Sequence, residues 1–301
     1  GHSQSKNLPV EWSETKNIAW KTSIAGRAWS SPVIWGDQIW LSNAMADGSR
    51  LSAICIDART GKVLFDQTLL NIAEPPPCHP FNSYASPTPV VEEDRVYLHF
   101  GSLGTVCLDT RTFAVVWQRQ DLPCDHMRGP GSSPILWNEF LVLTFDGADQ
   151  QYLVTLDKHS GKTVWRTDRN IDYGAEKNSN GDFKKAYSTP VVHDVKDMPM
   201  LVSVSAGATV AYDARDGQEL WRVPTGGYNS GCRPLFYRDL VIGNSEGGLS
   251  LFAIRYQMQG AAFTAEAAWS YPRGAPARSS PILVDDLLFP ISIEGVLSCV
   301  D

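Results

Sequence analysis

The fold is decided by the stretch Asp57-Ala-Arg-Thr-Gly61-Lys-Val-Leu-Phe65, in which a large aromatic residue follows an aspartate by eight positions. The aspartate can accept backbone N–H bonds across a tight turn, and the glycine can take the positive φ that closes a short hairpin. The same interval recurs from Asp109 to Trp117, from Asp157 to Trp165 and from Asp213 to Trp221. This pattern predicts a repeat protein whose units pack through the aromatic side chain.

A second repeated element precedes each of these stretches. A small polar residue, a proline and an aliphatic residue recur as Ser31-Pro32-Val33, Thr88-Pro89-Val90, Ser133-Pro134-Ile135, Thr189-Pro190-Val191 and Ser280-Pro281-Ile282, with Arg233-Pro234-Leu235 as a variant. Each proline is followed by a short apolar run, a polar turn and a second apolar run, which indicates a β-hairpin. A third run leads to the aspartate and a fourth carries the aromatic residue, so each unit contains four strands.

Four short strands per repeat of 44 to 57 residues indicate an all-β fold, a β-propeller built from four-stranded blades. The chain contains six repeats. We expect a single propeller domain over residues 1–301, with blades that start near residues 30, 86, 132, 188, 232 and 279.

Trp20 predicts how the ring ends. It lies twelve residues before Pro32, where a fourth-strand aromatic belongs, but three preceding strands are missing. The sequence stops after the third strand of the sixth repeat, so we expect an N-terminal strand at about 17–24 to complete the last blade. Two arrangements stay open, namely a closed six-bladed ring and six blades of an eight-bladed propeller.

Two repeats depart from the pattern. In the second repeat Phe113 occupies the glycine position, so we expect a different turn there. In the fifth repeat Arg255 occupies the aspartate position and Trp269 comes late, which predicts an insertion over 257–268.

Composition limits the possible functions. Apolar residues make up 43% of the chain and charged residues 20%, as in folded globular proteins. The net charge is −7 and the Lys and Arg residues are scattered, which argues against nucleic acid as a partner. No apolar stretch approaches the roughly 20 residues of a membrane span, and residues 1–7 lack the apolar centre of a signal peptide.

The Asp-x-x-Thr-Gly-x-x-x-Trp pattern resembles the PQQ-like repeat family, and the resemblance covers nearly the whole chain. That family includes quinoprotein dehydrogenases and BamB-like proteins of outer-membrane β-barrel assembly. The sequence looks closest to uncharacterised secreted bacterial members. The resemblance implies a periplasmic or extracellular location, and a protein partner or a small polar or anionic ligand.

The resemblance does not extend to the cofactor. Quinoprotein dehydrogenases share an adjacent Cys-Cys disulfide over the quinone and a calcium ion held by Glu, Asn and Asp side chains. None of the six cysteines here is adjacent to another. We therefore expect no cofactor, and PQQ with calcium stays an alternative that the site residues do not support.

The loops between blades are the place to look for function, because in a propeller they lie on the face that opens into the central funnel. The candidate ligand-binding residues of this face are His79, Asn82, Tyr84, Asp125, His126, Arg128, Asp146, Asp149, Arg233 and Arg278. Four arginines, Arg27 together with three of these, lie shortly before strand-one prolines and would suit an anionic ligand. The alternative is that each arginine pairs with a neighbouring Asp or caps a carbonyl.

Two successive linkers contain Cys78-His79 and Cys124-Asp125-His126. If the loops meet, Cys78, His79, Cys124 and His126 offer the nitrogen and sulfur ligands that suit zinc or copper. The alternatives are a Cys78–Cys124 disulfide and four independent loop residues.

The sequence contains no nucleophile elbow, P-loop, dinucleotide fingerprint or zincin motif, and no catalytic residue is assigned. The leading hypothesis is a non-catalytic secreted or periplasmic propeller that binds a protein or a ligand. The alternatives are a structural scaffold and a quinoprotein-like dehydrogenase or other metal-assisted enzyme. In the enzyme the site would lie in the central funnel, with Asp146 or Asp149 as the base.

Overall fold

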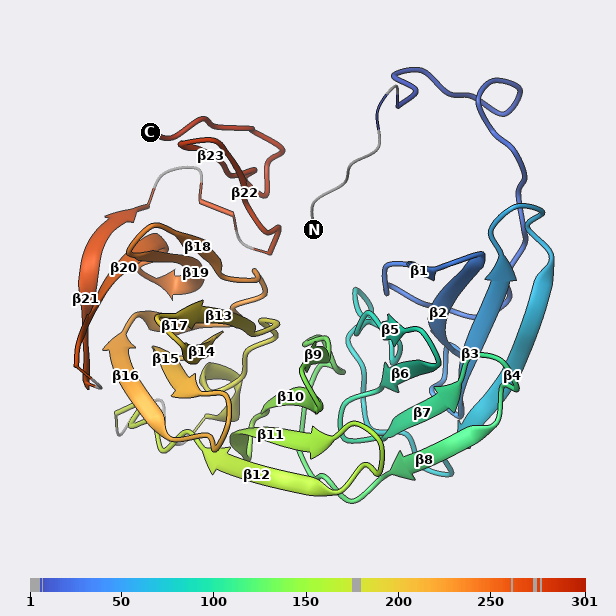
Figure 1. The fold of residues 1–301 in the computed structure, drawn as a ribbon, viewed down its shortest axis with the longest axis horizontal. Coiled ribbons are helices and arrows are strands. Elements are labelled where there is room, and N and C mark those ends of the chain that lie inside the picture. Colours follow the sequence, from blue (N-terminus) through green and yellow to red (C-terminus); the bar gives the residue numbers. More distant parts are fainter. Residues whose placement is uncertain (1–5, 7, 175–179, 261, 273–274, 277) are drawn as a thin grey trace.

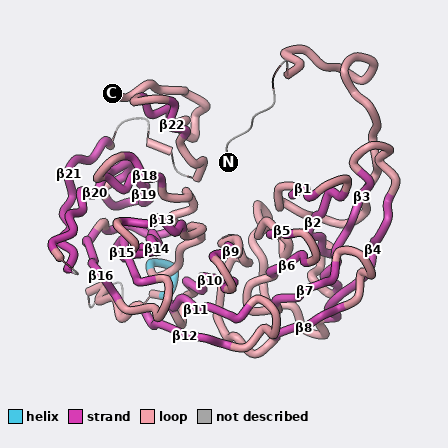
Figure 2. Tube along the Cα trace, in the orientation of Figure 1, coloured by secondary structure: helices cyan, strands magenta, loops and turns pink. Residues whose placement is uncertain are grey.

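The computed structural model describes residues 6, 8–174, 180–260, 262–272, 275–276 and 278–301. Their regular structure is β-strand except for one 3-10 turn, η1 (Gly181–Phe183), coloured cyan in Figure 2. Nowhere in this part of the chain is there a helix with the length and apolar character of a membrane span.

The strands form antiparallel sheets in sequence order. Blade one contains β1 (Val33–Trp35), β2 (Gln38–Ala44), β3 (Arg50–Asp57) and β4 (Val63–Asn71). Blade two contains β5 (Val90–Glu92), β6 (Arg95–His99), β7 (Thr105–Asp109) and β8 (Val115–Arg119). Blade three contains β9 (Ile135–Trp137), β10 (Phe140–Asp146), β11 (Gln151–Asp157) and β12 (Thr163–Asp168).

The second half of the chain continues this arrangement with small changes. Blade four contains β13 (Val191–Val195), β14 (Met198–Val204), β15 (Ala208–Asp213) and β16 (Glu219–Pro224). Blade five contains β18 (Leu235–Tyr237), β19 (Leu240–Gly248), β20 (Ser250–Gln259) and β21 (Ala262–Tyr271), and β17 (Gly226–Tyr228) also pairs with β19. The sixth repeat contributes β22 (Ile282–Val284) and β23 (Leu287–Phe289), and Val300 bridges to Leu288.

Figure 1 shows the blades side by side along an arc, with β1, β5 and β9 toward the inside and β4, β8 and β12 along the outside. The two middle strands of each of the first four blades are the most buried, and the core consists of their side chains packed between neighbouring sheets. The predicted β-propeller of four-stranded blades is confirmed.

The arc is open at its ends, which corrects the expectation that residues 17–24 complete the last blade. These residues form no strand, and none of their hydrogen bonds reaches residues 296–301. The Trp20 indole instead donates to the Ala58 carbonyl of blade one. Figure 1 shows the two ends of the arc facing each other across a gap.

The aromatic residue at the end of each repeat joins neighbouring blades. In three joints its indole N–H donates to a carbonyl in the next turn: Trp20 to Ala58 (2.9 Å), Trp117 to Lys158 (2.9 Å) and Trp165 to Ala214 (3.1 Å). The indole lies directly on the turn glycine, where a Cβ would come within 2.5–2.7 Å of the ring. Glycine is therefore required there both by its positive φ and by the close contact.

The joint between blades one and two corrects the expectation of a different turn at Phe113. Phe113 takes a left-handed φ of 62° and donates its N–H to the Asp109 carbonyl at 2.9 Å, as Gly61 does to Asp57. The turn is therefore conserved in shape, although this conformation is costly for an aromatic residue. The cost is offset because Phe65, the smaller aromatic of blade one, stacks on Phe113 with ring centroids 5.0 Å apart. A Phe–Phe stack thus replaces the Trp–Gly contact.

Blade five retains the shared register despite its insertion. Ala253 pairs with Trp269 and a bulge follows at once, as it does after the pair of Cys55 and Phe65 in blade one. The inserted residues lengthen β20 and β21 into a long hairpin beyond this point, so the predicted insertion is confirmed.

At the inner edge of the arc, a second set of hydrogen bonds joins the blades. The backbone N–H of the residue before a strand-one proline donates to the hydroxyl at the same position of the next blade: Ser31 to Thr88, Thr88 to Ser133, Ser133 to Thr189, and Arg233 to Ser280, at 2.9–3.0 Å. One position earlier, the side chain donates to the carbonyl of its equivalent: Ser132 to Ser188, Ser188 to Cys232, and Cys232 to Ser279. We call these positions the inner rim.

The Phe–Phe stack generates a stability test. Phe65→Trp alone crowds Phe113, and Phe113→Gly alone leaves a space beside Phe65, so each should lower the free energy of unfolding by about 1–3 kcal/mol. Combining them rebuilds the Trp–Gly contact of the other joints. Urea unfolding should therefore show a favourable coupling energy of about 1–3 kcal/mol in the double variant. Simple addition of the two losses would contradict this account of the joint.

Candidate functional site

A cavity of about 810 Å³ lies where the inner edges of the blades converge. One repeat position, three residues before each strand-one proline, supplies half of its wall. The six residues at that position are Trp29, Ser86, Gly131, Tyr187, Gly231 and Arg278. Because all six repeats contribute the same position, this cavity is the central funnel of the propeller.

The inner rim explains why that position faces the axis. The two residues next to the proline are held by hydrogen bonds to the neighbouring blade. In two repeats the third residue is also bound through its backbone: Trp29 donates its N–H to the Ala85 carbonyl at 3.3 Å, and Tyr187 donates its N–H to the Ser230 carbonyl at 2.7 Å. The side chains of both residues line the cavity.

Four of the predicted ligand-binding residues line the cavity, namely His79, Asn82, Arg128 and Arg278. The prediction missed the apolar residues of the wall. Trp29, Phe81 and Ile293 are 55%, 81% and 72% exposed, so the wall has a large apolar surface. An alignment of the repeats on their prolines would have identified Trp29.

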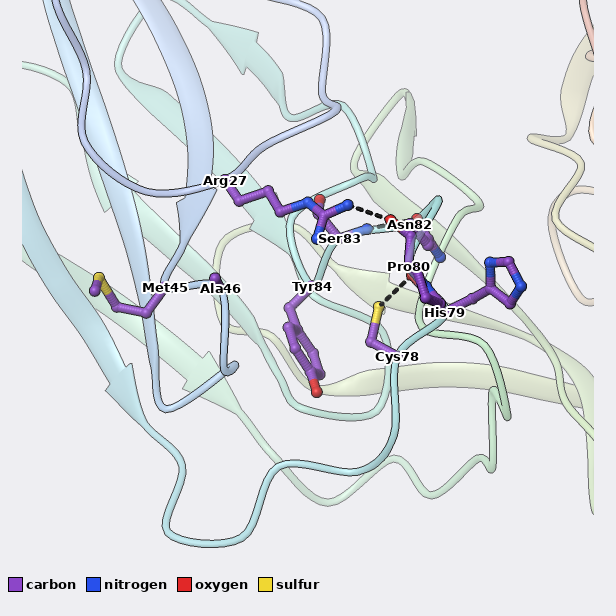
Figure 3. Close-up of a pocket in the computed structure, with 9 residues that line it drawn as sticks. All are labelled: Arg27, Met45, Ala46, Cys78, His79, Pro80, Asn82, Ser83 and Tyr84. Atoms are coloured by element: carbon purple, nitrogen blue, oxygen red, sulfur yellow. Dashed lines mark hydrogen bonds between the residues drawn. The ribbon is translucent and has the colours of Figure 1, made fainter.

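The predicted arginines have different environments. The Arg128 guanidinium lies 3.0 Å from the carboxylate of Asp182, which also binds Lys185. Although partial burial acts the other way, these two cations lower the pKa of Asp182. Arg27 lies over the ring of Trp29, 5.2 Å from its centroid. Its guanidinium also donates to the Pro80 carbonyl (Figure 3).

Arg278 is exposed on the cavity wall and its side chain contacts no acidic residue of the described chain. Arg233 is also exposed but lies outside the wall, and its backbone N–H belongs to the inner rim. The described wall contains no Asp or Glu. The cavity is thus positive in a chain whose net charge is −7.

Asp146 is placed differently from its prediction as a funnel residue. Its two carboxylate oxygens bind Nε and Nη2 of Arg169 at 2.5 and 2.8 Å, and both side chains are fully buried. Arg169 also donates to the Ser203 hydroxyl of blade four at 2.7 Å. Burial raises the pKa of Asp146, and the adjacent guanidinium opposes that shift. The pair joins blades three and four, and each carboxylate oxygen of Asp146 accepts a hydrogen bond from Arg169.

Three other predicted residues hold loops. The Tyr84 hydroxyl is buried and donates to the Pro76 carbonyl at 2.6 Å. Asp149 accepts the backbone N–H of Asp125 at 2.7 Å, and Asp125 in turn accepts the N–H of Met127 at 2.8 Å. None of these three lines the central cavity.

The two cysteine-containing loops meet, but their Cys and His side chains do not converge on one point. Asn82 donates to the Arg128 and Pro130 carbonyls at 2.8 and 3.0 Å, which joins the loops. Cys78 and Cys124 are free thiols, and the His79 ring projects away from Cys78 in Figure 3.

Cys124 Sγ lies 3.8 Å from His126 Nδ1, while His126 Nε2 accepts the Ser102 N–H at 3.1 Å. In the part of the chain that the structure describes, no three His, Cys, Asp or Glu residues are grouped to hold a metal ion. The metal set predicted from Cys78, His79, Cys124 and His126 is therefore not assembled, because one nitrogen of His126 is already used to hold a backbone N–H.

The chain matches one family model, that of the outer membrane protein assembly factor BamB, over residues 4–123 and 149–301. Among solved structures it is similar to BamB from Moraxella catarrhalis, with 17% identity and a TM-score of 0.60, covering 94% of this chain and 88% of that one. It is also similar to the quinohemoprotein alcohol dehydrogenase ADHIIG from Pseudomonas putida HK5, with 15% identity and a TM-score of 0.54.

The second comparison covers 89% of this chain but 46% of the dehydrogenase, so the chain spans about half of that enzyme. A search of curated proteins gave no match. At these identities the structural likeness shows the β-propeller fold alone.

His126 generates a test of the site's pH dependence. Burial lowers the pKa of His126 from its usual 6.5 to about 4, and protonation of Nε2 would remove its bond to Ser102. The unfolded chain therefore binds more protons between these values. Stability should be complete above pH 6.5 and fall as the pH is lowered toward 4, by about 2 kcal/mol at pH 5 for this residue alone.

Urea unfolding at pH 7.5 and pH 5 measures this effect. His126→Gln should lose less stability between the two pH values than the wild type, while His193→Gln, on the exposed face of β13, should behave as the wild type does. An unchanged pH dependence in His126→Gln would refute the assignment.

Proposed function

The chain belongs to the family of the outer membrane protein assembly factor BamB, and from this we propose that it is a non-catalytic β-propeller that binds a partner protein at its central cavity. The family also supports a location in the cell envelope, periplasmic or extracellular, and an envelope protein as the partner.

The composition of the cavity wall carries this proposal. Phe81 and Ile293 are large apolar side chains that remain more than two thirds exposed, and Trp29 is more than half exposed. Apolar and aromatic side chains gathered beside arginines on one open surface are typical of the centre of a protein interface. The hydrophobic core lies between the blades. Core packing therefore does not explain why these three apolar side chains lie on the surface.

The wall is also poorly suited to catalysis. Of the two carboxylates considered as bases, Asp146 is held by Arg169 and Asp149 holds a backbone N–H of the neighbouring loop. Neither lines the cavity. A binding function would use the residues that line the cavity. An enzyme function would need the two carboxylates, which do not line it.

Because the fold is similar to that of a quinohemoprotein dehydrogenase, we compare the residues of the cavity wall with those that PQQ and calcium would need. Calcium needs six to eight oxygen ligands, with carboxylates prominent among them. The described cavity wall offers no Asp or Glu, and no two cysteines of the chain are adjacent. The residues do not fit the group.

A reconstitution experiment tests this conclusion. After incubation with PQQ and calcium followed by gel filtration, the protein should retain no quinone absorbance and should reduce no dye with alcohols or aldoses. Retention of one quinone per chain, or dye reduction above the protein-free rate, would overturn the non-catalytic assignment.

Photo-crosslinking tests the binding function. We would place p-benzoylphenylalanine at Phe81, on the cavity wall, and as a matched control at Val164, which is 45% exposed on the outer strand β12. In the envelope fraction of the source cell, irradiation should attach one defined polypeptide at position 81, at least tenfold more than at 164. Equal adducts at both positions, or none at 81, would count against the proposal.

A further inference from the structure

We infer that the cavity recognises a peptide segment in which a carboxylate side chain lies next to aromatic or aliphatic residues, with Arg278 as the group that binds the carboxylate. This inference rests on the proposed function and specifies the chemistry of the partner. It follows from three features of the wall: one uncompensated positive charge, two buried polar atoms without partners, and exposed apolar side chains around them.

The uncompensated charge is that of Arg278. The other arginine of the wall, Arg128, is compensated, because Arg128 and the buried Lys185 share Asp182, and Glu246 also lies near enough to favour the charge on Lys185. Arg278 has no such neighbour in the described chain and projects from the inner rim position that faces the axis. A guanidinium in this setting binds a carboxylate through paired N–H donors.

Two polar atoms of the wall favour a peptide over a simple anion. The Tyr187 hydroxyl and the Asn229 side-chain carbonyl are buried, and neither has a hydrogen-bond partner among the residues that the structure describes. Both residues line the cavity. Buried polar groups are costly when unpaired. Asn229 Oδ1 is an acceptor and needs an N–H or O–H donor. The backbone N–H groups of an extended peptide supply one, whereas a fully deprotonated anion such as acetate or sulfate does not.

The exposed apolar side chains of the wall indicate the second feature of the bound peptide, an aromatic or aliphatic residue beside the carboxylate. Trp29 is fixed by the Arg27 guanidinium over its ring, and Phe81 packs against His79 with ring centroids 5.3 Å apart. Ile293 supplies a third apolar group. A ligand that consists of a carboxylate alone would leave these three side chains exposed to water. An aromatic or aliphatic residue next to the carboxylate would cover them.

The cavity's size fits a short segment of chain. Its volume of about 810 Å³ falls in the range of roughly 300–1,000 Å³ that is usual for ligand pockets. That volume accepts a few residues of a partner, so the rest of the partner would lie outside on the face formed by the loops.

Two amidated peptides test the inference with purified protein: acetyl-Ala-Phe-Glu-Trp-Ala-amide and its counterpart with Gln in place of Glu. Isothermal titration should show the Glu peptide binding about tenfold more tightly than the Gln peptide. Arg278→Gln should lose this preference by weakening the Glu peptide about tenfold. Arg233→Gln, an exposed arginine outside the wall, should bind both peptides as the wild type does.

The outcomes separate this inference from the proposed function. Equal binding of the two peptides, an unchanged preference in Arg278→Gln, or equal weakening by Arg233→Gln overturns the inference. So does displacement of the Glu peptide by sodium acetate at an equal concentration, because that result shows that a carboxylate alone is enough. If Phe81 still crosslinks a partner, the proposed function stands without the inference; if it does not, both fail. Matching urea transitions of the two arginine variants exclude misfolding as the cause.

Discussion

The inner rim hydrogen bonds are the constraint on which the rest of this structure depends. A backbone N–H of one blade donates to a Ser or Thr hydroxyl of the next, at the residue before the strand-one proline. At the outer radius an aromatic ring lies on the turn of the next blade, as Trp117 does on Gly161. Two contacts at different radii fix both the spacing of two sheets and the angle between them, so the same joint repeats along the chain.

One joint lacks part of this arrangement. Arg233 occupies the rim position of blade five and has no hydroxyl to accept the N–H of Thr189. Other contacts hold blades four and five together. Strand β17 pairs with β19, Asn229 donates its N–H to the Lys185 carbonyl at 2.9 Å, and β16 packs against the long β21. The extra strand and the extended hairpin therefore lie at the joint where the rim lacks this N–H-to-hydroxyl bond.

The fold could be predicted from the sequence because the Asp-to-aromatic interval encodes a contact that every repeat makes. The departures from the repeat pattern could not be predicted from the sequence, because each depends on a residue that is distant in the sequence. Phe113 is intelligible only beside Phe65, and Asp146 only beside Arg169. The site was predicted in part for a related reason. The chemistry of charged and metal-binding residue types predicts Arg278, but it does not identify uncharged residues such as Trp29 and Tyr187 at the same position of the repeat.

The way the cavity wall is built has a consequence for its evolution. Two of the six residues that face the axis, Trp29 and Tyr187, are held by backbone N–H bonds to the Ala85 and Ser230 carbonyls, and the side chains of both line the cavity. The residues found there range from glycine to tryptophan and arginine. A side chain at such a position can change without altering these backbone bonds where space allows, but not at Gly131, where a Cβ would come within 2.9 Å of the Tyr187 ring. The side chains that would recognise a partner can therefore change largely separately from the contacts that hold the blades together.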